Sequence, residues 1–215
     1  MTTEEHYAAL GAGMTLLARM GELGEGVAVE LYSNNAVATL VAAMSVLDHN
    51  PEGLGTAVCD CSRALVVIPD CSVELYNQGV FSALLTAVSG CPIKILTYCE
   101  TSPQFATAVF NLLLAACEDF DELQQAVVAE EGLQTACSAL VFHQDNVRYQ
   151  VSGLELIRMI VVHVATLKEF MTMGGQTVAQ RLVGNSSSAA IPMRALDILT
   201  EMSSRCGSYA NAMQT

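Results

Sequence analysis

Residues 31–45 read LYSNNAVATLVAAMS, and residues 75–89 read LYNQGVFSALLTAVS. Both stretches begin with Leu-Tyr, carry a turn-forming residue at the fifth position and continue as an apolar run that ends in Ser. Two later segments keep the same outline, VVAEEGLQTACSAL from Val127 and FMTMGGQTVAQRL from Phe170. Self-similarity of this kind indicates an architecture built from repeated units.

The period of the repeat follows from the predicted turn residues Asn35, Gly79, Gly132 and Gly175, which are 44, 53 and 43 residues apart. Glycine and asparagine suit such turns because they adopt positive φ most readily. The spacings are close to those of helical repeats of about 40–47 residues. The excess falls in CPIKILTYCETSP, residues 91–103. We expect that segment to project from the stack or extend a helix, with its apolar residues packed back.

Between the turns, each unit predicts one long helix with a start signal and one apolar face. The start signals are Asn50-Pro51, Ser102-Pro103, Asp145 or Asn146, and Ser186–Ser188. Apolar residues then recur three and four residues apart, as on one buried helix face. They are Leu54, Val58, Cys61, Leu65 and Ile68; Phe105, Val109, Leu112 and Ala116; Val147, Val151, Leu154 and Val161; and Ile191, Ala195, Ile198 and Met202. A similar face precedes them at Tyr7, Leu10, Met14 and Leu17.

A short helix, a glycine turn, a second helix and a long third helix resemble the armadillo repeat, and HEAT repeats share most of this pattern. The segment DELQQAVVAEEGLQTACSAL (121–140) is especially similar to the first and second armadillo helices. The resemblance covers nearly the whole chain. It implies an all-α fold, a right-handed α-solenoid of stacked repeats in a single domain over residues 1–215. The chain begins like a third helix and ends in SYANAMQT, which suggests a piece of a longer solenoid or a capping last helix.

The composition argues against several classes of protein. Hydrophobic residues make up 52% of the chain and charged residues 14%, which excludes a disordered protein. Nine Lys and Arg against 22 Asp and Glu give a net charge of −13 with no basic stripe, so nucleic acid is not an expected partner. The longest charge-free stretch, 75–93, contains Asn, Gln, Gly and Pro and predicts no membrane span. The first residues do not resemble a signal peptide, so we expect an intracellular, cytoplasmic protein, with the nucleus left open.

The sequence shows no motif for catalysis or for a cofactor. Gly11-Ala12-Gly13 begins like a dinucleotide fingerprint, but Leu16 replaces the third glycine, and neither a phosphate loop nor a nucleophile elbow occurs. We therefore expect no enzyme and no cofactor. Cys59, Cys61 and Cys71 form the densest thiol group, but their spacing is not that of a zinc site, and core packing is preferred to a metal site.

Armadillo proteins line a concave groove with their third helices, and importin-like members place Trp and Asn there, one turn apart, to hold a basic peptide. In our register the matching pairs are Arg63 and Val67, Phe110 and Leu114, Leu154 and Arg158, and Asp197 and Glu201. No pair is Trp-Asn, which argues against a nuclear-import mechanism. The predicted partner-binding residues are Arg63, Phe110, Arg158, Asp197 and Glu201. Phe110 has two possible roles, an apolar anchor in the groove or a residue of the core.

The sequence therefore predicts a non-enzymatic scaffold or adaptor that binds a segment of another protein in the groove. One alternative is an importin-like or chaperone-cofactor-like binder of a basic peptide. Another is a structural or oligomerisation segment of a larger assembly, for example a cytoskeletal one. Exposed Arg and Phe in the groove favour the binder, and exposed apolar ends favour the structural segment.

Overall fold

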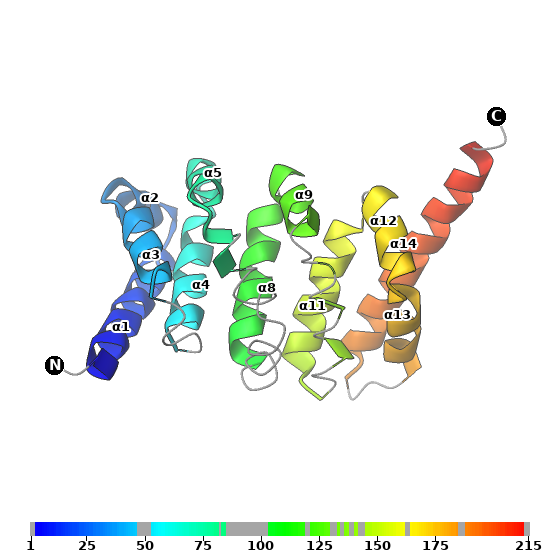
Figure 1. Cartoon of the computed structure of the whole chain (residues 1–215), viewed down its shortest axis with the longest axis horizontal. Helices are drawn as coiled ribbons and strands as arrows, with labels where there is room; N and C mark the ends of the chain where they lie inside the picture. The colour runs from blue at the N-terminus through cyan, green and yellow to red at the C-terminus, as the bar shows by residue number, and fades with distance from the viewer. Residues whose placement is uncertain are drawn as a thin grey trace. The chain divides into compact units, whose positions relative to one another are not determined.

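Every regular element in the described part of the chain is an α-helix, which confirms the predicted all-α class (Figure 1). The structure is a computed structural model. It describes residues 3–46, 53–81, 83–84, 103–118, 121–129, 133, 136–137, 140–141, 145–161, 164–184 and 188–212. The chain divides into two compact units, Met1–Leu123 (unit 1) and Gln124–Thr215 (unit 2).

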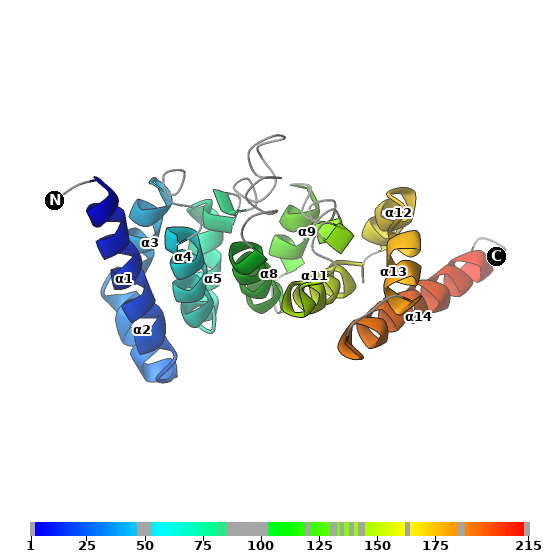
Figure 2. The same cartoon turned by 90° about the horizontal axis from the view of Figure 1, so that it is seen from below.

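Unit 1 is organised around three long helices. Its helices are α1 (Thr3–Gly21), α2 (Glu25–Ser33), α3 (Ala36–Met44), α4 (Gly53–Leu65), α5 (Pro69–Asn77) and α8 (Pro103–Cys117). Helix α4 packs on both α1 and α8, so these three long helices follow one another in a row (Figures 1 and 2). Helices α2 and α3 also pack on α4, and α5 packs on α3. The core of unit 1 therefore lies against the long helices.

Unit 2 has its core between the long helices α11 (Val147–Ile160) and α14 (Ala190–Ala212), which pack on each other. Helix α13 (Gly175–Gly184) packs on α14, and α12 (Val164–Thr172) packs on α13. The buried Gln150 donates a hydrogen bond from Nε2 to the carbonyl oxygen of Leu140, 2.8 Å away. This bond ties α11 to the helical residues that precede it. Helix α9 (Asp121–Ala129) spans the boundary between the units.

The same order of helices recurs along the chain. Four helices of nine residues, α2, α5, α9 and α12, begin at residues 25, 69, 121 and 164, so that they are 44, 52 and 43 residues apart. Each is followed by a long helix, α4, α8, α11 or α14. The structure thus reproduces the period that the sequence predicted.

The predicted turns are only partly correct. Asn35 and Gly79 adopt φ values of 64° and 72°, in the left-handed region, as expected. Gly132 lies outside the described residues. So do residues 91–102 of the predicted extra segment.

The fourth turn was placed one residue too late. Gly174, with φ at 78°, makes the turn, whereas Gly175 is the first residue of α13. A Cβ atom on Gly175 would lie 2.2 Å from Cε2 of Phe170, which is itself buried. The two glycines therefore meet different needs, since one makes the turn and the other allows a side chain to approach the backbone.

Three predicted helix starts fall among the described residues. Pro103 is the first residue of α8, as expected for proline at that position. Asn146, rather than Asp145, caps α11, because its side chain accepts a hydrogen bond from the backbone N–H of Tyr149 at 3.1 Å. Ser188 lies just before α14, and its hydroxyl accepts from the N–H of Ala190 at 3.4 Å.

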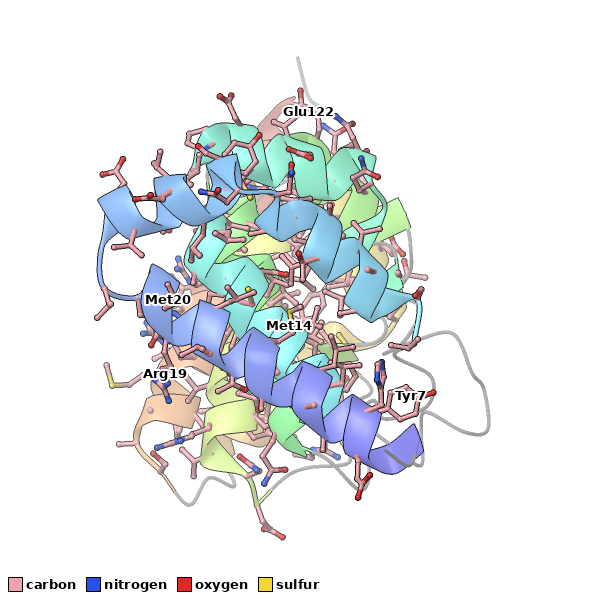
Figure 3. The ribbon with its side chains drawn as sticks, turned by 90° about the vertical axis from the view of Figure 1, so that its left-hand side faces the viewer. Tyr7, Met14, Arg19, Met20 and Glu122 are labelled. Carbon is pink, nitrogen blue, oxygen red and sulfur yellow. The ribbon has the colours of Figure 1, made fainter. Side chains whose placement is uncertain are left out.

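The predicted apolar faces are largely buried. All four predicted core residues of α8 and all four of α14 are buried. In Figure 3, Met14 lies on the side of α1 that faces α4, while Arg19 and Met20 project at the outer edge. The predicted α11 face is only partly correct. Val147 and Val151 are half-buried, because the buried face of α11 includes Tyr149, Gly153, Leu156 and Ile160 instead.

Within the described ranges, no single helix has the length and apolar character needed to cross a membrane. Helices α2 and α3 meet those criteria only as a pair, and they are bent by 72° where they meet.

Candidate partner-binding faces

Phe110, the apolar member of the predicted partner-binding set, belongs to the core of unit 1. Its side chain is only 1% exposed, so it offers no anchor on the surface, and the core alternative describes it correctly. The next residue, Asn111, is exposed. Neighbouring residues on a helix point about 100° apart, so Asn111 and not Phe110 lies on the exposed side of α8.

Arg63 lies on α4, where it joins two helices through an ion pair. Its Nη2 lies 2.7 Å from Oε1 of Glu22, in the turn after α1, and the side chain of Arg63 is 40% exposed. Arg19, at the end of α1, approaches the other carboxylate oxygen of Glu22 at 3.0 Å. We call this group, with Asp60, the α1–α4 face. One carboxylate here faces two guanidinium groups.

The close packing of small residues positions this ion pair. A Cβ atom on Gly21, the last residue of α1, would lie 2.8 Å from Cβ of Ala64 on α4. The two helices therefore approach closely only because position 21 has no side chain. Glu22 follows Gly21 directly and Arg63 precedes Ala64, so this contact brings their charged groups within reach of each other.

The charges of the α1–α4 face affect one another. The hydrogen bond from Arg19 is the largest cause that lowers the pKa of Glu22 below its ordinary value of 4.5, and Arg63 lowers it further, against the opposing effect of burial. Burial raises the pKa of Asp60, while the positive charge of Arg63 partly offsets that rise. Arg63 therefore stabilises two carboxylates at once.

In unit 2, one set of charged residues lies on α11 and α14, which pack on each other. Arg194 of α14 pairs with Glu155 of α11 at 2.7 Å and approaches Asp197 at 3.9 Å. Glu201 pairs with Arg205 one turn further along α14. Spacings of three and four residues bring these α14 side chains onto one helix face. We call the following residues the α11–α14 face: Arg148, Glu155, Arg158, Arg194, Asp197, Glu201 and Arg205.

Three predicted partner-binding residues belong to the α11–α14 face, namely Arg158, Asp197 and Glu201. Arg158 is exposed and lies three residues after Glu155 on α11. Arg63 belongs to unit 1, so the single track through all predicted residues stays a prediction.

Sequence reasoning missed Glu22, Glu155 and Arg194. For Arg194, a local signal existed in its three-residue spacing from Asp197. For Glu22 there was none, because its partner Arg63 is 41 residues away in the chain.

The cysteine group behaves as part of the core. Cys59, Cys61 and Cys71 are buried free thiols. Burial raises the pKa of Cys61 and of Cys71 to about 12, and raises that of Cys59 further. These thiols are therefore protonated near neutral pH and pack as small apolar groups. Among the described residues, no group of three His, Cys, Asp or Glu is arranged to hold a metal ion.

Comparison with known proteins gives a likeness in fold only. No protein-family model matches the chain, and no curated protein matches it. A crystal structure of an engineered protein from the Northeast Structural Genomics Consortium is similar, with a TM-score of 0.76 and 12% identity, over 92% of this chain and 76% of that one. A second engineered protein from the same consortium has a TM-score of 0.56 and 12% identity, over 95% of this chain and 98% of the other. At 12% identity, the similarity supports the helical fold and says nothing about function.

Proposed function

We propose that the chain is a non-enzymatic scaffold or adaptor of armadillo type that binds a segment of another protein. In this proposal the chain forms a right-handed solenoid whose long third helices carry the binding face. The recurring order of a nine-residue helix, a left-handed turn and a long helix supports the armadillo assignment. Five buried free thiols among the described residues fit a reducing, cytoplasmic compartment.

The α11–α14 face is the observation that carries this function. Two packed long helices bury their apolar faces and expose charged side chains of both signs, several of them joined in ion pairs. A face of this kind suits an extended or helical segment, which can form charged hydrogen bonds along it. Charged residues on a binding surface select the partner and its register more than they add affinity.

The test compares two exposed arginines of unit 2. The tagged chain is used to capture proteins from a cell extract, and the captured proteins are quantified by mass spectrometry. Arg158→Glu changes the α11–α14 face, and Arg181→Glu on α13 changes an exposed arginine outside it. We expect Arg158→Glu to reduce capture by about fivefold or more, and Arg181→Glu to leave it unchanged. Equal capture by both variants, with equal melting temperatures, would contradict the proposed face.

A second candidate function, oligomerisation within a larger assembly, has one observation in its favour. Exposed apolar side chains occur on α1 and just after it, where Leu16 and Leu23 are 62% and 78% exposed, and on α14, where Met193 and Leu196 are 66% and 55% exposed. Exposed apolar patches often mark contact sites.

This second function predicts self-association, which sedimentation measures. The mass of the wild-type chain should rise with concentration. The mass of the double variant Leu16→Gln, Leu23→Gln should rise less than that of the wild type at the same concentration. Val73→Gln is the matched control, because Val73 is 44% exposed and lies on α5, a different helix from either patch. A monomer at every concentration would exclude self-association.

A further inference from the structure

Within the described part of the chain, two arginines of α11 have exposed side chains with no acidic partner. Arg148 and Arg158 form no ion pair with a carboxylate among the described residues. Four other arginines do form such pairs: Arg19, Arg63, Arg194 and Arg205. In a chain with 22 acidic and only 9 basic residues, two such arginines on one helix are available to a partner.

The helix places these arginines on one accessible side. Arg148, Val151, Glu155 and Arg158 are the exposed or half-exposed positions along this side of α11. At about 100° per residue, the two arginines lie within about 80° of each other around the helix axis. With a rise of about 1.5 Å per residue, their Cα atoms are roughly 15 Å apart along it.

The neighbouring carboxylates on this face are already neutralised. Glu155 and Asp197 both face Arg194, and Glu201 pairs with Arg205. The α11–α14 face as defined above therefore holds four arginines against three carboxylates, in a chain whose net charge is −13. An incoming acidic group meets two arginines that none of the three carboxylates of this face occupies.

We infer that the α11–α14 face binds an acidic, extended segment of another protein, with one carboxylate on Arg148 and a second on Arg158. This inference rests on the proposed function and names the chemistry of its partner. An extended chain rises about 3.3 Å per residue and its side chains alternate between two sides, so a span of roughly 15 Å with both carboxylates on one side corresponds to a spacing of about four residues. Each guanidinium group matches a carboxylate with two parallel hydrogen bonds. The half-buried Val151 lies between them and accommodates an apolar side chain.

This partner differs from the basic peptide of the importin-like alternative, which two unoccupied arginines would repel. It also differs from a nucleic acid. Phosphates would meet the same arginines, but a chain with a net charge of −13 opposes a polyanion with one charge per nucleotide.

The inference is tested with synthetic peptides on the full chain. The probes are fluorescent twelve-residue peptides of Gly and Ser that carry two Asp, placed two to eight positions apart, with one Val between them. Binding is measured by fluorescence anisotropy at low salt. The wild-type chain should bind best at a separation of four. Arg148→Gln and Arg158→Gln should each weaken this binding by roughly two- to fivefold, and the double variant should lose the preference for separation. Arg181→Gln is the matched control and should bind as the wild type does.

Four results would overturn the inference. They are undetectable binding, binding that does not depend on the Asp separation, a double variant that binds as well as the wild type, and equal or tighter binding of a Lys peptide or of single-stranded DNA of matched length. If the peptides fail while Arg158→Glu still abolishes protein capture, the proposed function survives and only the acidic chemistry is wrong. If capture is unaffected by Arg158→Glu, the proposed function itself fails.

Discussion

The two units join their long helices with ion pairs of opposite design. In unit 1, one carboxylate, Glu22, faces two arginines, Arg19 and Arg63. In unit 2, one arginine, Arg194, faces two carboxylates, Glu155 and Asp197. Every one of these side chains is partly exposed, and exposed ion pairs contribute little to stability.

The comparison teaches that the buried contacts beneath the charges decide the geometry. In unit 1, the contact of Gly21 with Ala64 sets the distance between α1 and α4. In unit 2, the contact of Gly175 with Phe170 lets α13 begin directly after the turn. Changes at these glycines should therefore have larger effects than changes at the charged residues.

The largest effect is expected at Gly175. In Gly175→Ala, the new Cβ would lie 2.2 Å from the ring of Phe170, which is buried and has little room to move. Overpacking of this kind costs about 1–3 kcal/mol, and we expect the upper end of that range. Chemical denaturation measures it. Gly184→Ala is the control in the same helix, because no atom lies within 4 Å of its added Cβ. Equal stabilities of the two variants would contradict the close contact.

A smaller effect is expected at Gly21 in unit 1. In Gly21→Ala, the Cβ would lie 2.8 Å from that of Ala64, so α1 must move away from α4, at a cost of about 1–2 kcal/mol. Gly13→Ala, where the same helix has open space, should be neutral or stabilising. Ala64→Gly should restore part of the stability lost in Gly21→Ala. Absence of any rescue would show that position 21 acts through something other than Ala64.

The smallest effect is expected at the charges. Arg63→Ala should raise the pKa of Glu22 toward 4.5, measured by NMR titration of its side chain, with little change in melting temperature at neutral pH. Because the pKa of Glu22 is lowered in the folded chain, its charge stabilises the fold above the unfolded pKa, and that contribution is lost as pH falls through the folded value. The small difference in the free energy of unfolding between the wild type and Arg63→Ala should therefore be present at pH 7 and vanish in acid. Arg181→Ala should leave the titration of Glu22 unchanged.

The predicted helix pattern depended on local chemistry and was largely correct. Asn35 and Gly79 were found as turns because few residues adopt positive φ easily. Pro103 and Asn146 were found as helix starts because proline lacks an N–H and asparagine caps exposed N–H groups. The long apolar faces were found because burial repeats every three or four residues along a helix.

The candidate site was predicted less well, because it depends on which side of each helix is buried and which is exposed. Phe110 and Asn111 are adjacent and fit the same helix, but only the packing of other parts of the chain on α8 decides which of them is buried. Likewise Gly174 and Gly175 both allow a turn, and only the position of Phe170 separates their roles.

By itself, the sequence determined that the chain is helical, where three of its helices start, and the period at which short and long helices recur, because these follow from backbone preferences and the alternation of apolar residues. Only the tertiary structure decided which side chains share a face. Glu22 meets Arg63 across 41 residues, and Glu155 meets Arg194 on another helix, through contacts that no local pattern encodes. The physical reason is that one residue turns a helix by about 100°, so a pattern that locates a helix correctly still leaves its exposed face undecided until its neighbours pack against it.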